Sequence, residues 1–186
     1  MRGAVWASGL AHPSEAPMHA TAASLVLLLS TAALAQAPKV TREHLAPKGW
    51  EGSYHRLHYT PVLKVGNRVI ISGIPAAVGD TEEAKIRWAF EQLKRHLEAA
   101  GATLDDVVEL TSFHVAKDQA EFDKRVEPVL RVHREFFKKN YPAWTAVATP
   151  ALFSKEAPME LRAEAVIGSG KTARSSIPEP PAQPKP

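Results

Sequence analysis

The 186-residue chain contains no cysteine. This absence excludes disulfide bonds, metal sites built from thiolates, a cysteine nucleophile and a lipoprotein anchor, which needs an acylated cysteine. It is compatible with an oxidising compartment, although many cytosolic proteins also lack cysteine. The compartment therefore has to be inferred from other features of the chain.

The central part of the chain also lacks a surplus of charge of one sign. The net charge is +3, but residues 36–167 hold 19 Lys and Arg against 18 Asp and Glu. Most of the surplus lies in the tail after residue 167. A nucleic-acid-binding protein usually carries a basic stripe on its folded part. The composition therefore predicts no nucleic-acid partner.

One apolar run is too short to span a bilayer comfortably. Residues 20–34 are uncharged and mostly apolar, whereas a transmembrane helix needs about 20 such residues. The run ends in Ala33-Leu34-Ala35 before Gln36, an A-x-A cleavage pattern typical of a secretory signal peptide. A buried apolar helix is the alternative, but nothing periodic or charged balances the run.

We therefore predict that residues 1–35 are a signal peptide, cleaved after Ala35. Translation from either Met1 or Met18 would retain the apolar run. The mature protein is then periplasmic or secreted and has no membrane partner after cleavage. Residues 36–55 are predicted to be an N-terminal extension, and the proline-rich residues 168–186 a disordered tail. A proline-motif ligand is the alternative for that tail.

The middle of the chain alternates between two kinds of pattern. Stretches typical of β-strands are residues 56–65, 68–75, 107–116, 144–152 and 159–167. Gly66-Asn67 suits a tight hairpin turn between the first two stretches. The last stretch alternates strictly, so its apolar residues share one face and its charged residues the other.

Two further stretches have the helical period. In the first, apolar residues recur at spacings of four and three, and Gly101 ends the pattern. We expect Asp80 and Glu83 to form a capping box at its start. The second stretch begins at Asp118, and Pro128 inside it is expected to kink the helix or mark a local break.

The predicted order is ββαβαββ, an α+β fold with a mixed sheet and two helices on one face. Such a sheet leaves its other face without a cover. Oligomerisation would bury that face, so the pattern alone already favours an assembly of several copies.

The same order carries a set of short motifs. They include Tyr59-Thr-Pro-Val-Leu-Lys-Val-Gly-Asn67, Ile70-Ile-Ser-Gly-Ile-Pro75, Leu97-Glu-Ala-Ala-Gly101 and Tyr141-Pro-Ala143. Together, in this order and spacing, they resemble the RidA/YjgF family of reactive-intermediate deaminases. The resemblance covers residues 56–167. It implies a chorismate-mutase-like fold and a homotrimer around a central barrel, with small-molecule sites in the clefts between subunits.

Deaminating members of this family hydrolyse enamines and imines to keto compounds and ammonia without a cofactor or metal. The resemblance therefore implies no cofactor, no metal site, and partners limited to a small molecule and further copies of the chain. The eight histidines do not change this expectation, because the nearest pair, His55-x-x-His58, lacks the context of a zinc site.

The resemblance also implies site residues. Tyr59, Ser72 and Gly73 match residues that line the family's pocket. Trp144, followed by Thr145, stands where deaminating members carry the arginine that grips the substrate carboxylate. His114 is a further candidate for lining the pocket.

The last strand of deaminating members carries two glutamates at alternate positions. Glu160 matches the first of them, but Arg162 stands at the second. These two residues are the catalytic candidates. Since an arginine fork binds a carboxylate through two charge-assisted hydrogen bonds, its replacement by Trp144 predicts weak deamination or none.

Three interpretations of these departures stay open. In the first, Arg162, expected one strand away from Trp144, supplies the guanidinium for the substrate carboxylate from a different direction than the family's arginine. Alternatively, Trp144 and Tyr59 form an aromatic wall for a neutral or cationic ligand. In the third interpretation Arg162 forms a salt-bridged ladder with Glu160 and Glu164, and Trp144 fills the pocket.

The sequence therefore supports two main functions. One is an exported protein that binds a small metabolite and retains weak deamination of enamines or imines. The other is a purely non-catalytic binding trimer. A third function, ribonuclease, has been credited to some relatives, but the nearly balanced charge argues against it.

Overall fold

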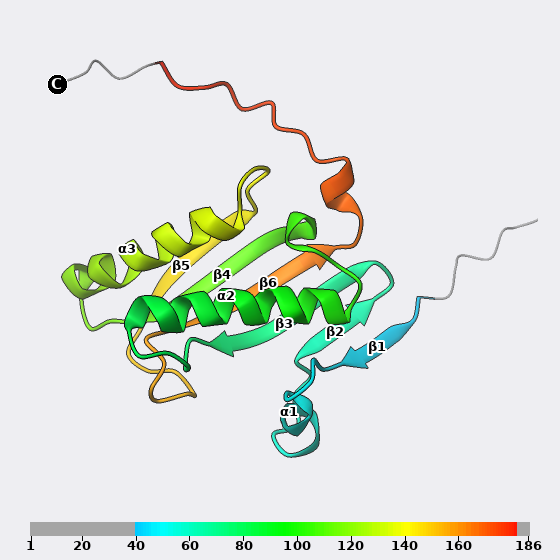
Figure 1. Ribbon diagram of the computed structural model, residues 1–186, viewed down its shortest axis with the longest axis horizontal. Helices are drawn as coiled ribbons and strands as arrows, with labels where there is room; N and C mark the ends of the chain where they lie inside the picture. Colours follow the sequence, from blue (N-terminus) through cyan, green and yellow to red (C-terminus); the bar gives the residue numbers. More distant parts are fainter. Residues whose placement is uncertain (1–39, 182–186) are drawn as a thin grey trace, which may run out of the picture. The chain divides into compact units, whose positions relative to one another are not determined.

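A computed structural model describes residues 40–181 (Figure 1). Its helices and strands follow in the order β1 (Arg42–Leu45), α1 (Glu51–His55), β2 (Val62–Val65), β3 (Arg68–Pro75), α2 (Glu82–Ala99), β4 (Val107–Val115), α3 (Gln119–Phe136), β5 (Ala143–Thr149) and β6 (Met159–Val166). Short 3-10 turns precede β4 and follow β6. The predicted signal peptide and residues 182–186 of the predicted tail lie outside the described residues.

The strands form one sheet in the order β1-β2-β3-β6-β4-β5. Only β4 and β5 are parallel neighbours, and the other pairs are antiparallel. The predicted hairpin is present, because Val65 pairs with Arg68 across Gly66-Asn67. Gly66 has φ +62, a backbone conformation that favours glycine. The predicted α+β fold with a mixed sheet is therefore confirmed.

Both long helices cover the same face of the sheet (Figure 1). The apolar residues of α2 that recur at helical spacing are all buried: Ile86, Phe90, Leu93, Leu97 and Ala100. They belong to one core with the apolar face of β6, which is Met159, Leu161, Ala163 and Ala165. Burying a side chain of the size of leucine or phenylalanine contributes roughly 1.5–3 kcal/mol. This layer between helices and sheet therefore dominates the stability of the fold.

The start of α2 differs from the prediction by one residue. Thr81, not Asp80, is the N-cap, and its side-chain oxygen accepts a hydrogen bond from the Ala84 amide at 3.1 Å. Its extended backbone suits a cap. Gly101 follows the end of the helix as predicted, at φ +78.

The second long helix begins where it was predicted. The Asp118 carboxylate accepts a hydrogen bond from the Glu121 amide at 2.9 Å. The helix then continues through Pro128 to Phe136, so Pro128 does not break it.

The first predicted strand proves too long. Only Val62–Val65 form a strand, while residues 51–55 form α1. Between them the chain turns through His58, whose φ of +57 is incompatible with a strand. Residues of the predicted N-terminal extension thus form β1 and α1, and β1 lengthens the sheet beyond β2.

The face of the sheet opposite the helices, here called the open face, has no helix over it within residues 40–181. Side chains alternate between the two faces along each strand, and paired residues point the same way. The register therefore puts on the open face the polar residues of β6 and several partly buried apolar residues: Glu160, Arg162, Glu164, Leu63, Ile70 and Phe113.

Candidate functional site

Six of the eight predicted site residues lie, with neighbours that were not predicted, in two clusters on opposite faces of the sheet. The first, called the open-face cluster, is Thr60, Ser72, Gly73 and Glu160, with Tyr59 next to Thr60 in the chain. The second, called the helix-side cluster, is Ser112, His114, His133 and Trp144, between the sheet and α3. Within one chain the two clusters are not brought together.

A bulge in β3 shapes the open-face cluster. The register between β3 and β6 shifts between Ile71 and Ile74, so Ser72 and Gly73 leave the regular ladder. The Ser72 amide donates to the Pro61 carbonyl at 3.0 Å, and its hydroxyl donates to the Thr60 carbonyl at 2.8 Å. The bulge thereby holds residues 59–61 beside Ser72.

Glu160 lies against Gly73. A Cβ atom at position 73 would overlap the Glu160 carboxylate, so the glycine makes room for this side chain. Glu160 is partly buried, and no hydrogen bond joins its carboxylate to another residue of the described part. Burial raises the pKa of the Glu160 carboxyl, because the charged form loses hydration without gaining a partner. A carboxyl that holds its proton more readily than an ordinary glutamic acid is suited to act as an acid or a base.

Arg162 is engaged in an ion-pair ladder that does not include Glu160. Its guanidinium bonds Glu164 at 2.6 Å and reaches Glu109 at 3.5 Å. Arg68 pairs with the second oxygen of Glu164. The hydrogen bond from Arg68 is the main cause that lowers the pKa of Glu164. The predicted ladder therefore exists with Glu164, but Glu109 takes the place predicted for Glu160.

Trp144 points to the other side of the sheet. Its indole stacks on the His133 ring, with centroids 4.8 Å apart and planes 8° from parallel. Its Nε1 donates to the Ser112 hydroxyl at 2.9 Å. Since β4 lies between β5 and β6, Arg162 is two strands from Trp144 and on the opposite face. The expectation that Arg162 lies one strand away and replaces the missing guanidinium is therefore wrong for a single chain.

His114 lies in the helix-side cluster rather than on the open face. It is fully buried, its Nε2 is 2.8 Å from the Ser112 hydroxyl, and its ring meets Phe122 edge-on at 5.4 Å. Burial lowers the pKa of His114 to about 4. Burial is also the main cause that lowers the pKa of His133, with a smaller effect of Arg134. Both rings are therefore neutral at pH 7.

A groove runs between the N-terminus of α3 and the exposed strand β5. This α3/β5 groove has a volume of about 430 Å³ and is lined by Ala116, Lys117, Asp118, Gln119, Phe122, Ala146, Val147 and Ala148. Thr145 is exposed on β5 and pairs with Thr111 of the open face.

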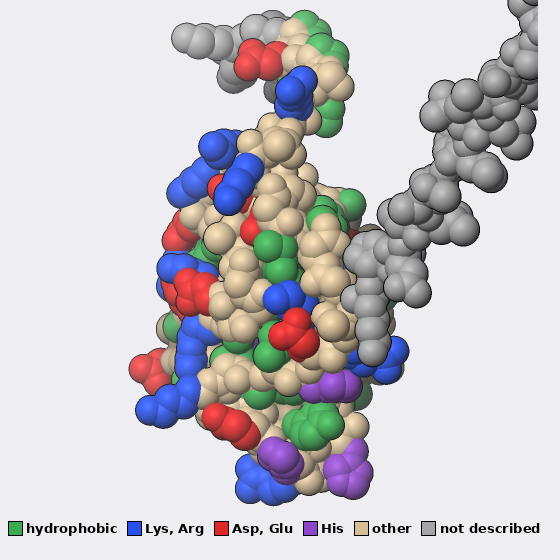
Figure 2. All heavy atoms as spheres, turned by 90° about the vertical axis from the view of Figure 1, so that its right-hand side faces the viewer, with side chains coloured by type: hydrophobic (Ala, Val, Ile, Leu, Met, Phe, Trp, Pro, Cys, Tyr) green, Lys and Arg blue, Asp and Glu red, His purple; other side chains and the backbone are tan. Residues whose placement is uncertain are grey.

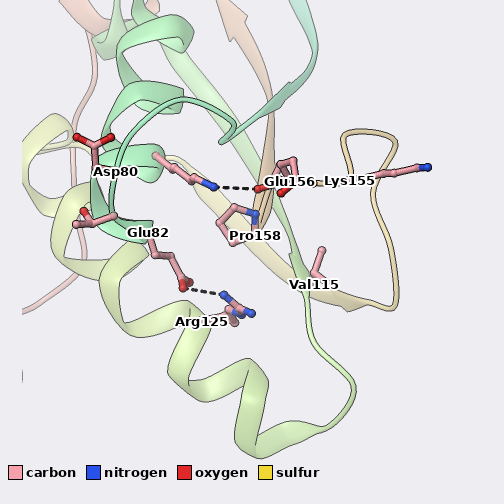
Figure 3. Close-up of a pocket in the computed structure, with 10 residues that line it drawn as sticks. Asp80, Glu82, Val115, Arg125, Lys155, Glu156 and Pro158 are labelled. Atoms are coloured by element: carbon pink, nitrogen blue, oxygen red, sulfur yellow. Dashed lines mark hydrogen bonds and ion pairs between the residues drawn. The ribbon is translucent and has the colours of Figure 1, made fainter.

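A second hollow, near the start of α2, is drawn in Figure 3. Its acidic groups are Asp80, Glu82 and Glu156, and its basic groups are Lys85, Arg125 and Lys155. Arg125 pairs with Glu82 at 2.7 Å, and the Lys85 ammonium donates to the Glu156 carbonyl at 3.2 Å. The hollow therefore has three acidic and three basic side chains, of which Arg125 and Glu82 form an ion pair, and it has no surplus of either charge.

Figure 2 shows histidine side chains gathered near one end of the molecule. The exposed histidines of the described part are His44, His55 and His58. Even so, residues 40–181 contain no group of three or more His, Asp or Glu side chains arranged to hold a metal ion. None of the helices within residues 40–181 is long and apolar enough to cross a membrane.

Sequence reasoning missed the partners of Trp144. Neither Ser112 nor His133 was among the predicted site residues. A signal for the first was present, because Ser112 and His114 are two residues apart on a predicted strand and so share a face. No local signal pairs His133 with Trp144, which comes from a separate strand.

The similarity to known proteins covers this same domain. The family model described as "Endoribonuclease L-PSP" matches residues 54–167. The RutC family protein YjgH of Escherichia coli is 32% identical over 117 residues, which is 58% of this chain and 83% of that protein.

Solved structures of family members also resemble this chain. A member of the YjgF/YER057c/UK114 family from Mycobacterium tuberculosis aligns with a TM-score of 0.58 and 26% identity, over 68% of this chain and 100% of that one. RidA from an Antarctic Psychrobacter bacterium aligns with a TM-score of 0.52 and 30% identity, over 59% of this chain and 88% of that one. With its fold, its motifs and more than half of its length matched, the chain belongs to the RidA/YjgF family, whose model carries the description endoribonuclease L-PSP.

Proposed function

We propose that the mature protein is exported, binds a small metabolite in clefts between subunits, and has at most weak deaminase activity on imines and enamines. The observation that carries this proposal is that Trp144 has no charge and uses its indole N–H within the protein. The residue stands where deaminating relatives carry the carboxylate-binding arginine, and its only side-chain N–H donor already bonds Ser112.

The loss of the arginine has a large energetic effect on acidic substrates. A hydrogen bond to a charged group contributes about 1.5–3 kcal/mol, and an arginine fork makes two of them. Indole carries no charge, and the Trp144 ring is further committed to the stack with His133. A 2-imino acid is therefore bound weakly and without a fixed orientation.

The open face retains one group that can transfer a proton, the Glu160 carboxyl. Glu160 has a raised pKa and no hydrogen-bond partner among the described residues, so it can pass a proton to or from an imine nitrogen or a water molecule. An unpaired carboxylate also favours neutral or cationic ligands over acidic ones. Next to Glu160, the ligand group that this site suits best is therefore a neutral or cationic nitrogen, such as that of an imine or amine.

The two clusters need a second copy of the chain to act together. They lie on opposite faces of one sheet, so a cleft between subunits is the arrangement in which Tyr59 and Glu160 of one copy approach the α3/β5 groove of the next. The uncovered open face supports such an assembly, for which we propose the trimer.

Export supports a binding role over a catalytic one. The pyridoxal-phosphate enzymes that release reactive imines are cytosolic, so a protein cleaved after Ala35 and sent to the periplasm or beyond is separated from them. The almost balanced charge of residues 36–167 gives no support to a ribonuclease.

The proposal is tested by ammonia and keto-acid release from freshly generated 2-iminobutyrate. We expect turnover by the unmodified chain to be far below that of the Trp144→Arg variant. The variant restores a guanidinium at the family's position and should gain at least tenfold, because one charged hydrogen bond alone exceeds 1.4 kcal/mol.

Two further variants sharpen this experiment. Glu160→Gln removes the proton-exchanging group and should abolish the residual turnover and any gained through Trp144→Arg. Leu130→Arg introduces the same charge at an exposed position of α3 and should leave turnover unchanged. High turnover by the unmodified chain, unaffected by Glu160→Gln, would contradict the proposal.

A further inference from the structure

A chain of hydrogen bonds under α3 is not used by the chemistry proposed for Glu160. Trp144 Nε1 donates to the Ser112 hydroxyl at 2.9 Å, and that hydroxyl lies 2.8 Å from His114 Nε2. Ser112 and His114 are both fully buried. The three residues form a continuous polar line from strand β5 into the space beneath α3.

The direction of these hydrogen bonds determines where the His114 proton lies. An indole N–H can only donate, so the Ser112 oxygen is the acceptor of that bond. The Ser112 oxygen has a second lone pair, to which a His114 Nε2–H would also be able to donate. In that arrangement the Ser112 hydroxyl hydrogen would have no partner among the described residues, whereas a hydroxyl that donates to Nε2 uses it. The hydroxyl therefore donates to Nε2, and a neutral imidazole with an accepting Nε2 carries its hydrogen on Nδ1.

The resulting Nδ1–H has no hydrogen-bond partner within residues 40–181, although the atom is buried. A buried donor without a partner is destabilising because it has lost its hydrogen bonds to water, so native structures rarely leave one unused. A ligand or water oxygen that accepts from Nδ1 would remove this cost. The network therefore points to an acceptor that residues 40–181 do not themselves provide.

The α3/β5 groove lies next to this donor. His114 is in register with Ala148 on the neighbouring strand, and its ring touches Phe122. Ala148 and Phe122 both line the groove, together with the N-terminal residues of α3. The small side chains of Ala146 and Ala148 leave room there, and Phe122 separates the imidazole from the groove.

We propose that His114 is a ligand-binding residue whose Nδ1–H donates to a carbonyl or carboxylate oxygen of a small ligand that enters from the α3/β5 groove. Trp144 is then a positioning residue that holds His114 in the required tautomer through Ser112. This inference rests on the proposed metabolite binding and adds the ligand class: a small compound with an exposed carbonyl-type oxygen. Entry requires rotation of the Phe122 side chain.

The tautomer can be measured on the unliganded chain by long-range proton–nitrogen NMR of ¹⁵N-labelled histidine at pH 7. We expect His114 to be neutral with its proton on Nδ1. Butanone and 2-ketobutyrate are then titrated as probes. Saturable shifts of His114 Nδ1 with both probes support a carbonyl acceptor, and shifts with 2-ketobutyrate alone support a carboxylate acceptor. A proton on Nε2, or no shift with either probe, would overturn the inference.

Trp144→Phe tests the positioning role, because it removes the indole N–H while keeping a ring to stack on His133. The Ser112 hydroxyl is then free to reverse. We expect both His114 tautomers to appear and probe binding to weaken by roughly three- to tenfold, the effect of one neutral hydrogen bond. Trp88→Phe makes the same chemical change on α2 and is the control. An unchanged tautomer and affinity in Trp144→Phe would contradict the role.

The results for the His114 tautomer and the probe titrations are independent of the result of the deaminase assay. A chain without turnover that shows the Nδ1 proton and responds to the probes keeps the inference. A chain that deaminates 2-iminobutyrate but carries its His114 proton on Nε2 overturns the inference alone.

Discussion

At the scale of single residues, burial decides the protonation of the core histidines. His96 and His114 are at most 1% exposed. The His96 Nδ1 lies 2.7 Å from the Gln92 carbonyl, a bond that favours a ring carrying a hydrogen there. Burial nevertheless outweighs this effect and lowers the pKa of His96 to about 4, as it does for His114. Both residues are therefore neutral components of the fold at pH 7.

These histidines make stability depend on pH. An unfolded histidine takes up a proton near pH 6.5, but the folded residues stay neutral down to about pH 4. Above pH 6.5 these histidines are neutral in both states, so they do not lower the free energy of unfolding. As the pH falls from 6.5 towards 4, the unfolded chain takes up protons that the folded chain does not, and the free energy of unfolding falls. Each histidine accounts for up to about 3 kcal/mol of this loss, at 1.36 kcal/mol per pKa unit.

Urea denaturation between pH 7.5 and 5 measures this effect. We expect the free energy of unfolding to fall across that range, and to fall less steeply in His96→Gln, which cannot take up a proton. His55→Gln, a change at an exposed histidine, should leave the slope as it is. Equal slopes in His96→Gln and the unmodified chain would show that His96 does not contribute.

At the scale of elements, the N-terminal segment is held to α2 by Trp50. Its ring packs edge-on against His96 at 4.6 Å, and its Nε1 donates to the Gln92 side chain at 3.3 Å. Arg95 adds a hydrogen bond to the Lys48 carbonyl at 3.0 Å. These contacts and the pairing of β1 with β2 attach residues 42–55 to the family domain.

Trp50→Ala should detach this segment without unfolding the domain. The loss of a packed aromatic side chain costs about 3–5 kcal/mol when it is fully buried, and less for the partly buried Trp50. In hydrogen–deuterium exchange we expect faster exchange in residues 42–55 and unchanged protection in β3, β4 and β6. Tyr54→Ala, which removes an exposed ring from the same segment, is the control. A uniform increase across the sheet would mean that Trp50 supports the whole core.

The ion pairs between α2 and α3 contribute less than this packing. Arg131 bonds Glu83 at 3.1 Å and Arg87 pairs with Glu135, but all four side chains are 40–49% exposed. Pairs in water contribute about 0–1 kcal/mol each and are weakened by salt. The helices are therefore held in place mainly by their apolar faces.

At the scale of the whole molecule, the open face requires a cover. It presents Phe113 and the exposed Val147 beside the ladder of Arg68, Glu164 and Arg162. The edge strand β5 is exposed at five of its seven positions, and unpaired strand edges favour association with another chain. Both features are explained if copies of the chain pack together through the open face.

We expect the purified chain to have the mass of a trimer in solution. Val147→Lys puts a charge on the open side of β5, where it does not disturb the core of one chain, and should produce monomers. Leu130→Lys changes a residue of similar exposure on α3 and should leave the trimer intact. Light scattering distinguishes these masses. A monomeric unmodified chain would contradict both the trimer and the cleft between subunits.

Local patterns were sufficient for most of the fold. The Gly66-Asn67 turn, the α2 pattern that ends at Gly101 and the alternation that starts at Met159 each depend on neighbours a few residues away, and each has a fixed period. Two errors about the fold also came from local ambiguity. Residues 56–61 are rich in residues that suit either a strand or a turn, and two adjacent residues, Asp80 and Thr81, were both good caps.

The sequence by itself determined the family, the α+β order and the tryptophan at position 144. Only the tertiary structure decided what that tryptophan contacts. The stack of Trp144 on His133 and the pairing of Arg68 with Glu164 join residues far apart in the chain. They arise because β6 inserts between β3 and β4, an arrangement set by the packing of the whole core rather than by any local period.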